Sequence, residues 1–205
     1  MMITRIKSAI SQKLKTDLEV IMDKWITTYT SNYSGGKMRG DRGEDIETFV
    51  INSINYIGKE LKTNLIAKKG SSDKKLMKLE INNKVIKKMH QVDVHVYLNK
   101  NFICAIECKA YLDSCYYVRA CDDFKLFKKF GYDIKNYIFT LENSIDEDTK
   151  LFTDHITDNI CDNVFYILDG KRSSSKPIYD ERYKKEINND NFINFIEFIF
   201  NLIRL

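Results

Sequence analysis

The fold of this chain is decided by residues 91–111, QVDVHVYLNKNFICAIECKAY. Apolar residues stand at every second position from Val92 to Leu98, and a second alternating run leads from Phe102 to Lys109. A period of two is typical of strands that bury one face. The stretch therefore predicts two short antiparallel strands joined by a tight turn.

The turn sets which side chains face each other across this hairpin. If residues 99–101 form a three-residue loop, Leu98 pairs with Phe102 and Asp93 lies opposite Glu107. A two-residue turn would shift the register by one and move Asp93 to the other face. Directly opposed side chains have Cβ atoms about 4.5–5.5 Å apart, so two carboxylates there repel unless a cation or a proton lies between them.

Lys109 adds a third charged group, one same-face step beyond Glu107. Alternating charges on a strand usually mark a solvated face, and an Asp followed downstream by Glu-x-Lys is common by chance. Here the apolar Ile103 and Ala105 share the face of these charges, which favours a functional cluster.

Asp93 and the triplet Glu107-Cys108-Lys109 together resemble the motif of the PD-(D/E)XK nucleases, and most closely that of the small type II restriction endonucleases. Val92 stands where the motif has its proline. Residues 42–47, RGEDIE, are similar to the G-x-x-x-E segment on the helix that precedes the nuclease sheet. The resemblance covers residues 40–170, which would form the catalytic core.

This resemblance implies an α/β fold, in which a mixed central β-sheet is flanked by helices around an α-β-β-β-α-β core. It implies a homodimer that cuts double-stranded DNA at a specific sequence with Mg²⁺ and leaves 5′-phosphate ends. A cognate DNA methyltransferase acting on the same site would be a further partner. The resemblance selects Glu47 as a third acid, with Glu44 as the alternative.

Hydrophobic periodicity gives the same order of elements. The pattern predicts strands within residues 76–90 with a turn at Asn82-Asn83 between them. Together with the hairpin these strands would form a meander. Helices are expected over 43–62, from about 114 to 130 and around 146–160, with buried strands at 136–141 and 163–168. Gly131 is well placed to end the second of these helices.

The charged cluster suits metal-assisted phosphodiester hydrolysis. Asp93 and Glu107, close and ionised, would form an oxygen site for Mg²⁺, and the backbone carbonyl of Cys108 could add a ligand. Lys109 would hold the attacking water or help deprotonate it, with a pKa lowered by the metal and the apolar strands. Glu47 could bind a second metal ion or a water.

Basic segments around this cluster are the expected DNA contacts, although a solvated surface is the ordinary explanation for each of them. Residues 31–42, SNYSGGKMRGDR, read as a mobile, glycine-rich loop, and residues 170–185 read as a second loop. The expected contacts are Lys37, Arg39 and Arg42 in the first loop, Lys87 and Lys88 in the lysine-rich strands, Arg119 on the helix of residues 114–130, and Lys171 and Arg172 in the second loop.

Composition sets bounds on the rest. A chain of 205 residues with 43% apolar residues is expected to form a single domain over residues 1–205, and a net charge of +4 is compatible with a polyanionic partner without requiring one. Five cysteines without a C-x-x-C pair argue against a zinc ribbon or a disulfide framework, so we expect buried thiols in a reducing, cytoplasmic compartment. No apolar run is long enough to predict a membrane span.

The two ends of the chain are predicted helices. Residues 1–30 carry an apolar stripe that would either cover the sheet or pair with a second copy of the chain. Residues 190–205 carry a second stripe, which would complete the core or form a subunit interface.

Two other functions stay open on the sequence. A DNA repair nuclease or Holliday-junction resolvase of the same superfamily would prefer branched DNA over a fixed sequence. A non-catalytic DNA-binding module would bind DNA without Mg²⁺ and would tolerate Asp93→Ala.

Overall fold

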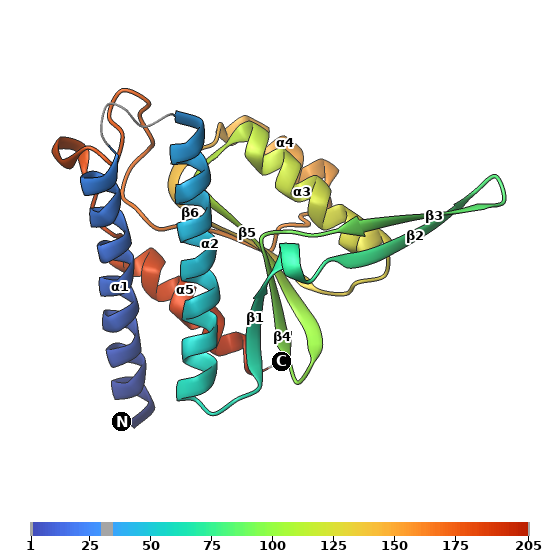
Figure 1. The fold of residues 1–205 in the computed structure, drawn as a ribbon, viewed down its shortest axis with the longest axis horizontal. Helices are drawn as coiled ribbons and strands as arrows, with labels where there is room; N and C mark the ends of the chain where they lie inside the picture. The colour runs from blue at the N-terminus through green and yellow to red at the C-terminus, as the bar shows by residue number, and fades with distance from the viewer. Residues whose placement is uncertain (1, 30–34, 205) are drawn as a thin grey trace.

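A mixed five-stranded sheet forms the centre of the computed structural model, which describes residues 2–29 and 35–204 (Figure 1). Its strand order is β1-β4-β5-β6-β7, with β1–β4 and β4–β5 antiparallel and β5–β6 and β6–β7 parallel. The strands are β1 Leu65–Lys69, β4 Val94–Leu98, β5 Asn101–Asp113, β6 Lys135–Ser144 and β7 Asn163–Tyr166. The predicted α/β class, with a mixed central sheet, is confirmed.

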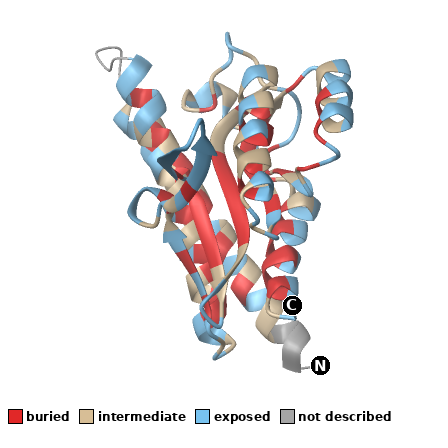
Figure 2. Cartoon of the chain, turned by 90° about the vertical axis from the view of Figure 1, so that its right-hand side faces the viewer, coloured by how far each residue is buried: buried red, intermediate tan, exposed pale blue. Residues whose placement is uncertain are grey.

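Helices cover both faces of this sheet (Figure 1). One core lies between the sheet and three helices, α1 Met2–Thr28, α2 Gly35–Glu60 and α5 Asn189–Leu202. A second core lies beneath α3 Ser114–Lys129, and α4 Glu147–Ile156 packs against α3. The middle strands β4, β5 and β6 each contain a continuous buried run, over residues 94–96, 104–108 and 138–142 (Figure 2).

The alternation that predicted the central hairpin is seen in the packing. Val94, Val96, Cys104 and Ile106 are fully buried in the core beneath α1, α2 and α5, whereas Ala105 is buried in the core beneath α3. The period of two thus distributes the side chains of β4 and β5 over two different cores.

The apolar stripe of α1 is used inside the chain. Ile10, Leu14, Leu18 and Trp25 are buried in the same core as α2 and α5. These side chains therefore cover the sheet, the first of the two predicted uses of the stripe, while pairing of the helix with a second copy stays a prediction.

Residues 35–42 form the first turns of α2 and not a loop. Their glycines argued for a loop, but Met38 and Arg42 are buried, so tertiary packing outweighs the low helix propensity of glycine. Ser31–Ser34 of the expected mobile loop lie outside the described residues. Strand β1, whose apolar part is only Leu65–Ala67, is too short to be recognised from its pattern.

The predicted turn at Asn82-Asn83 exists, with φ values of 51° and 60° at the two residues. Its strands, β2 Lys75–Ile81 and β3 Lys84–His90, pair only with each other and form a separate sheet. The meander of the central sheet therefore begins with β1, and β2–β3 is an arm that extends away from the body (Figure 1).

The remaining elements follow their predictions closely. Asp113 caps α3 by accepting a hydrogen bond from the amide of Tyr116, and Gly131 ends the helix with a φ of 82°. Asp146 caps α4 in the same way, accepting from the amide of Thr149. Short 3-10 helices occur at Gly70–Ser72 (η1) and Glu181–Tyr183 (η2). None of the described helices combines the length and the apolar character that crossing a membrane requires.

Candidate active site

The hairpin that carries the predicted acids has a shorter turn than expected. Leu98 pairs with Asn101, so the turn is the two residues Asn99 and Lys100, with φ values of 50° and 70°. The prediction of a three-residue loop is therefore wrong. Two adjacent residues with positive φ are typical of a type I′ turn, whose twist matches that of the strands.

A β-bulge restores the predicted register before the site is reached. Tyr97 pairs with Phe102 but Val96 pairs with Cys104, which leaves Ile103 as the extra residue. Beyond the bulge Val94 pairs with Ile106, and this register, continued by one residue, sets Asp93 beside Glu107. The expected juxtaposition of the two acids thus arises from two deviations that cancel.

Three charged side chains meet at this point. The Nζ atom of Lys109 lies 2.9 Å from Oδ2 of Asp93 and 2.5 Å from Oε2 of Glu107. Oδ2 of Asp93 also accepts a hydrogen bond of 2.8 Å from the backbone amide of Cys108. Glu107 is buried, while Asp93 and Lys109 are partly exposed.

The protonation states of the two acids are driven apart. Burial and the neighbouring Asp93 carboxylate raise the pKa of Glu107 to about 8. Burial also acts to raise the pKa of Asp93, but Lys109, Glu107 and the Cys108 amide together lower it below its ordinary value. Without a bound cation, Asp93 is therefore the ionised member of the pair and Glu107 holds a proton at neutral pH.

The neighbouring acids shift the pKa of Lys109 in the cation-free protein. Burial acts to lower its pKa, but the carboxylates of Glu107 and Asp93 outweigh burial and raise the pKa above its ordinary value. The expected lowering of this pKa depended on a bound metal ion as well as on the apolar strands, so it stays a prediction for the metal-bound protein. In the cation-free protein Lys109 is a charged hydrogen-bond donor.

Glu47 projects toward the same site from α2. Its Oε1 atom is buried and has no hydrogen-bond partner among the described residues, and its Oε2 atom lies 3.6 Å from Nζ of Lys69. Burial, and then repulsion from Asp93, raise its pKa. Glu44, the alternative third acid, is mostly exposed and pairs with Lys69 at 3.1 Å. The geometry therefore favours Glu47 over Glu44.

A cavity of about 430 Å³ joins these groups. Its walls come from the first half of α2, the end of β1, the Asp93 segment, the middle of β5 and the start of α3. The lining includes Arg39, Arg42, Glu44, Glu47, Lys69, Asp93, Cys108, Lys109, Tyr111 and Tyr116. Acidic residues from two separate segments, α2 and the Asp93 segment, thus border one open space, and Glu107 lies behind Lys109 at its edge.

The residues present fit a hard divalent cation. Asp93 and Glu107 both reach Nζ of Lys109 with a carboxylate oxygen, and Glu47 is a further acidic residue of the cavity wall. Mg²⁺ is commonly held by one or two carboxylates together with several waters. In the described part of the chain no group of three or more His, Cys, Asp or Glu side chains is already drawn together tightly enough for a metal ion. Any binding there would use the two-carboxylate mode.

Two of the predicted DNA contacts lie on the cavity wall. Arg39 and Arg42 both line it from α2. Arg42 is buried, with its guanidinium 5.0 Å from the ring centre of Tyr179 and 6.0 Å from that of Trp25. It was expected in an exposed loop, and the structure makes it a packed helical residue at the edge of the site.

The other predicted contacts are more dispersed. Lys37 lies on the first turn of α2 and Arg119 lies on α3. Arg172 stacks on Tyr111, a residue of the cavity wall, at 3.7 Å from its ring centre, and Lys171 precedes it. Lys87 and Lys88 belong to β3 in the arm and do not line the cavity. Their roles stay predictions.

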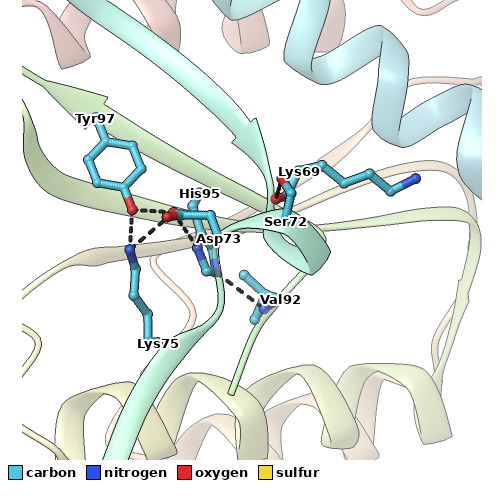
Figure 3. A network of polar contacts seen from close by, with 7 residues as sticks. All are labelled: Lys69, Ser72, Asp73, Lys75, Val92, His95 and Tyr97. Carbon is cyan, nitrogen blue, oxygen red and sulfur yellow. Dashed lines mark hydrogen bonds and ion pairs between the residues drawn. The ribbon is translucent and has the colours of Figure 1, made fainter. Parts of the chain in front are cut away.

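A polar network behind the site was missed by sequence reasoning. Asp73 accepts hydrogen bonds from Tyr97, Lys75 and Nδ1 of His95, the last at 3.1 Å (Figure 3). The amide of Val92 donates to Nε2 of His95 at 3.5 Å, and burial lowers the pKa of this histidine. His95 thus holds the segment that leads into Asp93.

Gly70 completes this support. Its amide donates a 2.8 Å hydrogen bond to the carbonyl of Asp93, and a Cβ at this position would lie 1.7 Å from the carbonyl oxygen of Val92. The only sequence signal for such a role is a lone glycine beside a lysine-rich strand, which is too weak to single it out.

Comparison with curated proteins agrees with the motif. Over 164 residues the chain is 26% identical to the type II restriction enzyme DdeI of Desulfomicrobium norvegicum. The match spans 72% of this chain and 65% of that enzyme, slightly less than two thirds of its length. The chain is similar to a type II restriction enzyme. No protein-family model matches the chain.

Comparison with solved structures gives matches at low sequence identity. Protein VC1899 from Vibrio cholerae superposes with a TM-score of 0.50 at 10% identity, over 91% of this chain and 43% of that protein. BbvCI, solved as a native A2B2 tetramer, gives a TM-score of 0.40 at 8% identity, over 98% of this chain and 92% of its own. The likeness to VC1899 concerns the fold alone.

Proposed function

We propose that this chain is a Mg²⁺-dependent endonuclease that hydrolyses phosphodiester bonds of double-stranded DNA at a specific sequence. The observation that carries the proposal is the contact of Lys109 with both Asp93 and Glu107, at 2.9 and 2.5 Å, beside a cavity that Asp93, Lys109 and Glu47 line together. The similarity to a type II restriction enzyme supports the choice of reaction.

Asp93 and Glu107 would hold the metal ion, with the Cys108 carbonyl as a further ligand. A bound Mg²⁺ lowers the pKa of water and neutralises charge that develops on a phosphate. Glu107 has to release its proton to bind a cation, since only the ionised carboxylate is a good ligand. Once that proton has left, Glu107 and the neighbouring Asp93 would each offer a carboxylate oxygen as a ligand for the metal ion.

Lys109 acts as a positioned hydrogen-bond donor. Its ammonium group lies within hydrogen-bond distance of Asp93 and Glu107, so it is suited to hold a water or a phosphate oxygen at this place. Glu47, a lining residue of the same cavity, would accept a hydrogen bond from a water that the metal ion holds.

DNA would approach along the α2 side of the cavity. Arg39 and Arg42 line this wall and carry the fixed positive charge that phosphates require. Lys37 on the same helix and Arg172, stacked on Tyr111, extend the basic surface on either side. Neutralising these residues should weaken binding and reduce its dependence on salt.

Cleavage of a long duplex of known sequence tests the proposal. The purified protein should give discrete fragments with Mg²⁺ and none with EDTA, and the mapped ends should carry 5′-phosphates. Asp93→Asn, Glu107→Gln and Lys109→Met should each lower the rate by at least about 100-fold. Glu44→Gln, which alters an exposed acid at the same cavity, should cut normally.

Folding of each variant is checked by circular dichroism and thermal unfolding, because Glu107 and Lys109 are packed together. If the three variants cut as fast as the wild type, or if EDTA leaves cleavage unchanged, the assignment of this site is wrong.

A further inference from the structure

The arm and α4 carry most of the exposed large apolar side chains. Twelve such side chains are exposed among the described residues. Six of them, Leu76, Leu79, Ile81, Val85, Ile86 and Met89, lie on the arm, and three, Leu151, Phe152 and Ile156, lie on α4. Apolar residues gathered in this way on two elements are typical of interaction surfaces, whereas scattered ones are not.

One face of the arm has an apolar centre between positive ends. Leu79 pairs with Ile86 and Ile81 pairs with Lys84, while Lys88 opposes the buried Met77 on the same face. Directly opposed residues share a face, so Leu79, Ile81 and Ile86 form one patch between Lys84 and Lys88. In the described part of the chain these two lysines have no ion-pair partner.

The exposed surface of α4 complements the patch on the arm in charge. Leu151, Phe152 and Ile156 form an apolar centre, with Phe152 65% exposed. The exposed acids Glu147 and Asp148 begin the helix, and Asp158 follows its end. The patch on α4 therefore has an apolar centre between negative ends, opposite in sign to the patch on the arm.

The arm does not use its own α4 in this way, because both patches are exposed in the same structure (Figure 2). It is also an isolated two-stranded hairpin whose burial is confined to its base at Met77 and His90. Such hairpins are marginally stable without further packing. The arm therefore has an unpaired surface, and α4 of another molecule has the matching one.

We infer that the arm of one molecule docks on α4 of a second copy of this chain, through Leu79, Ile81 and Ile86 on Leu151, Phe152 and Ile156. Lys84 and Lys88 lie against the acids at the two ends of α4. The contact is reciprocal, so two copies exchange arms and close a two-fold dimer with two identical contacts. The inference does not depend on the chemistry of the Asp93 cluster.

A charge exchange tests the contact with the full-length protein and without DNA. The wild type should be a dimer in analytical ultracentrifugation at micromolar concentration. The arm variant Lys84→Glu/Lys88→Glu and the helix variant Glu147→Lys/Asp148→Lys should each raise the dissociation constant at least tenfold. A 1:1 mixture of the two variants should form heterodimers, because one contact is then native and in the other the charges are reversed on both sides at the start of α4.

Apolar substitutions give a second readout. Ile86→Ser and Phe152→Ser should weaken the dimer, while Ile193→Ser, an equally exposed apolar position on α5, should not. All of these side chains are exposed, so unchanged thermal unfolding at low protein concentration is the folding control.

Three results would overturn the inference. The first is a wild type that stays monomeric at 100 µM, and the second is a dimer that none of the arm or α4 variants weakens. The third is a monomer whose arm variants lose affinity for duplex DNA, which would show that the arm contacts DNA and not a second copy of the chain.

Discussion

The carbonyl oxygen of Val92 lies 1.7 Å from the position that a Cβ atom would take on Gly70, and the Gly70 amide donates to the neighbouring carbonyl of Asp93. The backbone that presents Asp93 thus rests directly on the backbone of η1. Only a residue without a side chain allows this approach.

Gly70→Ala should therefore displace Asp93. Both contacting atoms are backbone, so the clash cannot be relieved by a rotamer change. We expect a loss of about 1–3 kcal/mol of unfolding free energy and a loss of cleavage larger than this destabilisation explains. Urea unfolding and initial cleavage rates measure the two effects. Gly36→Ala, at an open position of α2, should instead stabilise the protein by about 0.5–1 kcal/mol. Equal effects of the two substitutions would contradict the role given to Gly70.

The substitution Glu47→Gln tests whether Glu47, and not Glu44, is the third acid of the site. The substitution removes a charge that burial and Asp93 disfavour, so the folded protein should be as stable as the wild type or slightly more stable. Cleavage with Mg²⁺ should fall about 10- to 100-fold, the usual effect of losing a group that supports a metal site. Rates measured over a Mg²⁺ titration check this. Normal cleavage by Glu47→Gln and impaired cleavage by Glu44→Gln would reverse the assignment.

The network around Asp73 should make stability depend on acidity. Burial acts to raise the pKa of Asp73, but hydrogen bonds from Tyr97, Lys75 and His95 outweigh it and lower the pKa from 3.8 to about 2. A depressed pKa stabilises the folded state above pH 4, and this contribution is lost as pH falls from 4 to 2. It amounts to about 2 kcal/mol. Urea unfolding between pH 2 and 5 should show this loss, and Asp73→Asn should flatten it. A variant of an exposed acid, Asp148→Asn, should keep the wild-type slope.

The thiols should differ sharply in reactivity. Cys104, Cys108 and Cys121 are buried, and burial raises the pKa of each, so their thiolate forms are scarce. Cys115 is exposed. Iodoacetamide at pH 8 should modify Cys115 first, and Cys115→Ser should remove the fast phase seen by mass spectrometry. Rapid labelling of Cys108 in the native protein would show that the core beneath the site opens readily.

The strands and helices of this chain were predictable where side-chain periodicity alone decides them. The two-residue period of β4 and β5 identified the hairpin, and Asp113 and Gly131 marked the ends of α3. The start of α2 was not predictable, because Met38 and Arg42 are held in a helix by packing against distant parts of the chain. The same holds for the arm, since the pattern of β2 and β3 shows strands without showing which sheet they join.

The part of the site that was predicted lies within a single hairpin. Asp93, Glu107 and Lys109 follow from register within one hairpin, and the structure brings them together. The support from Gly70 and Asp73 could not be predicted, because it depends on how η1 and the base of the arm meet the segment before β4. Such contacts join residues about twenty positions apart and leave no periodic signal.

The bulge at Ile103 separates the turn of the hairpin from the two acids. A related chain with one more residue in the turn and no bulge would present Asp93 and Glu107 in the same register. Hairpin loops of different length are therefore compatible with one arrangement of acids. Such a relative has as many residues between the two acids as this chain, so the two sequences should be aligned across the hairpin without a gap. An alignment that opened a gap at the turn would misplace one of the acids by one residue.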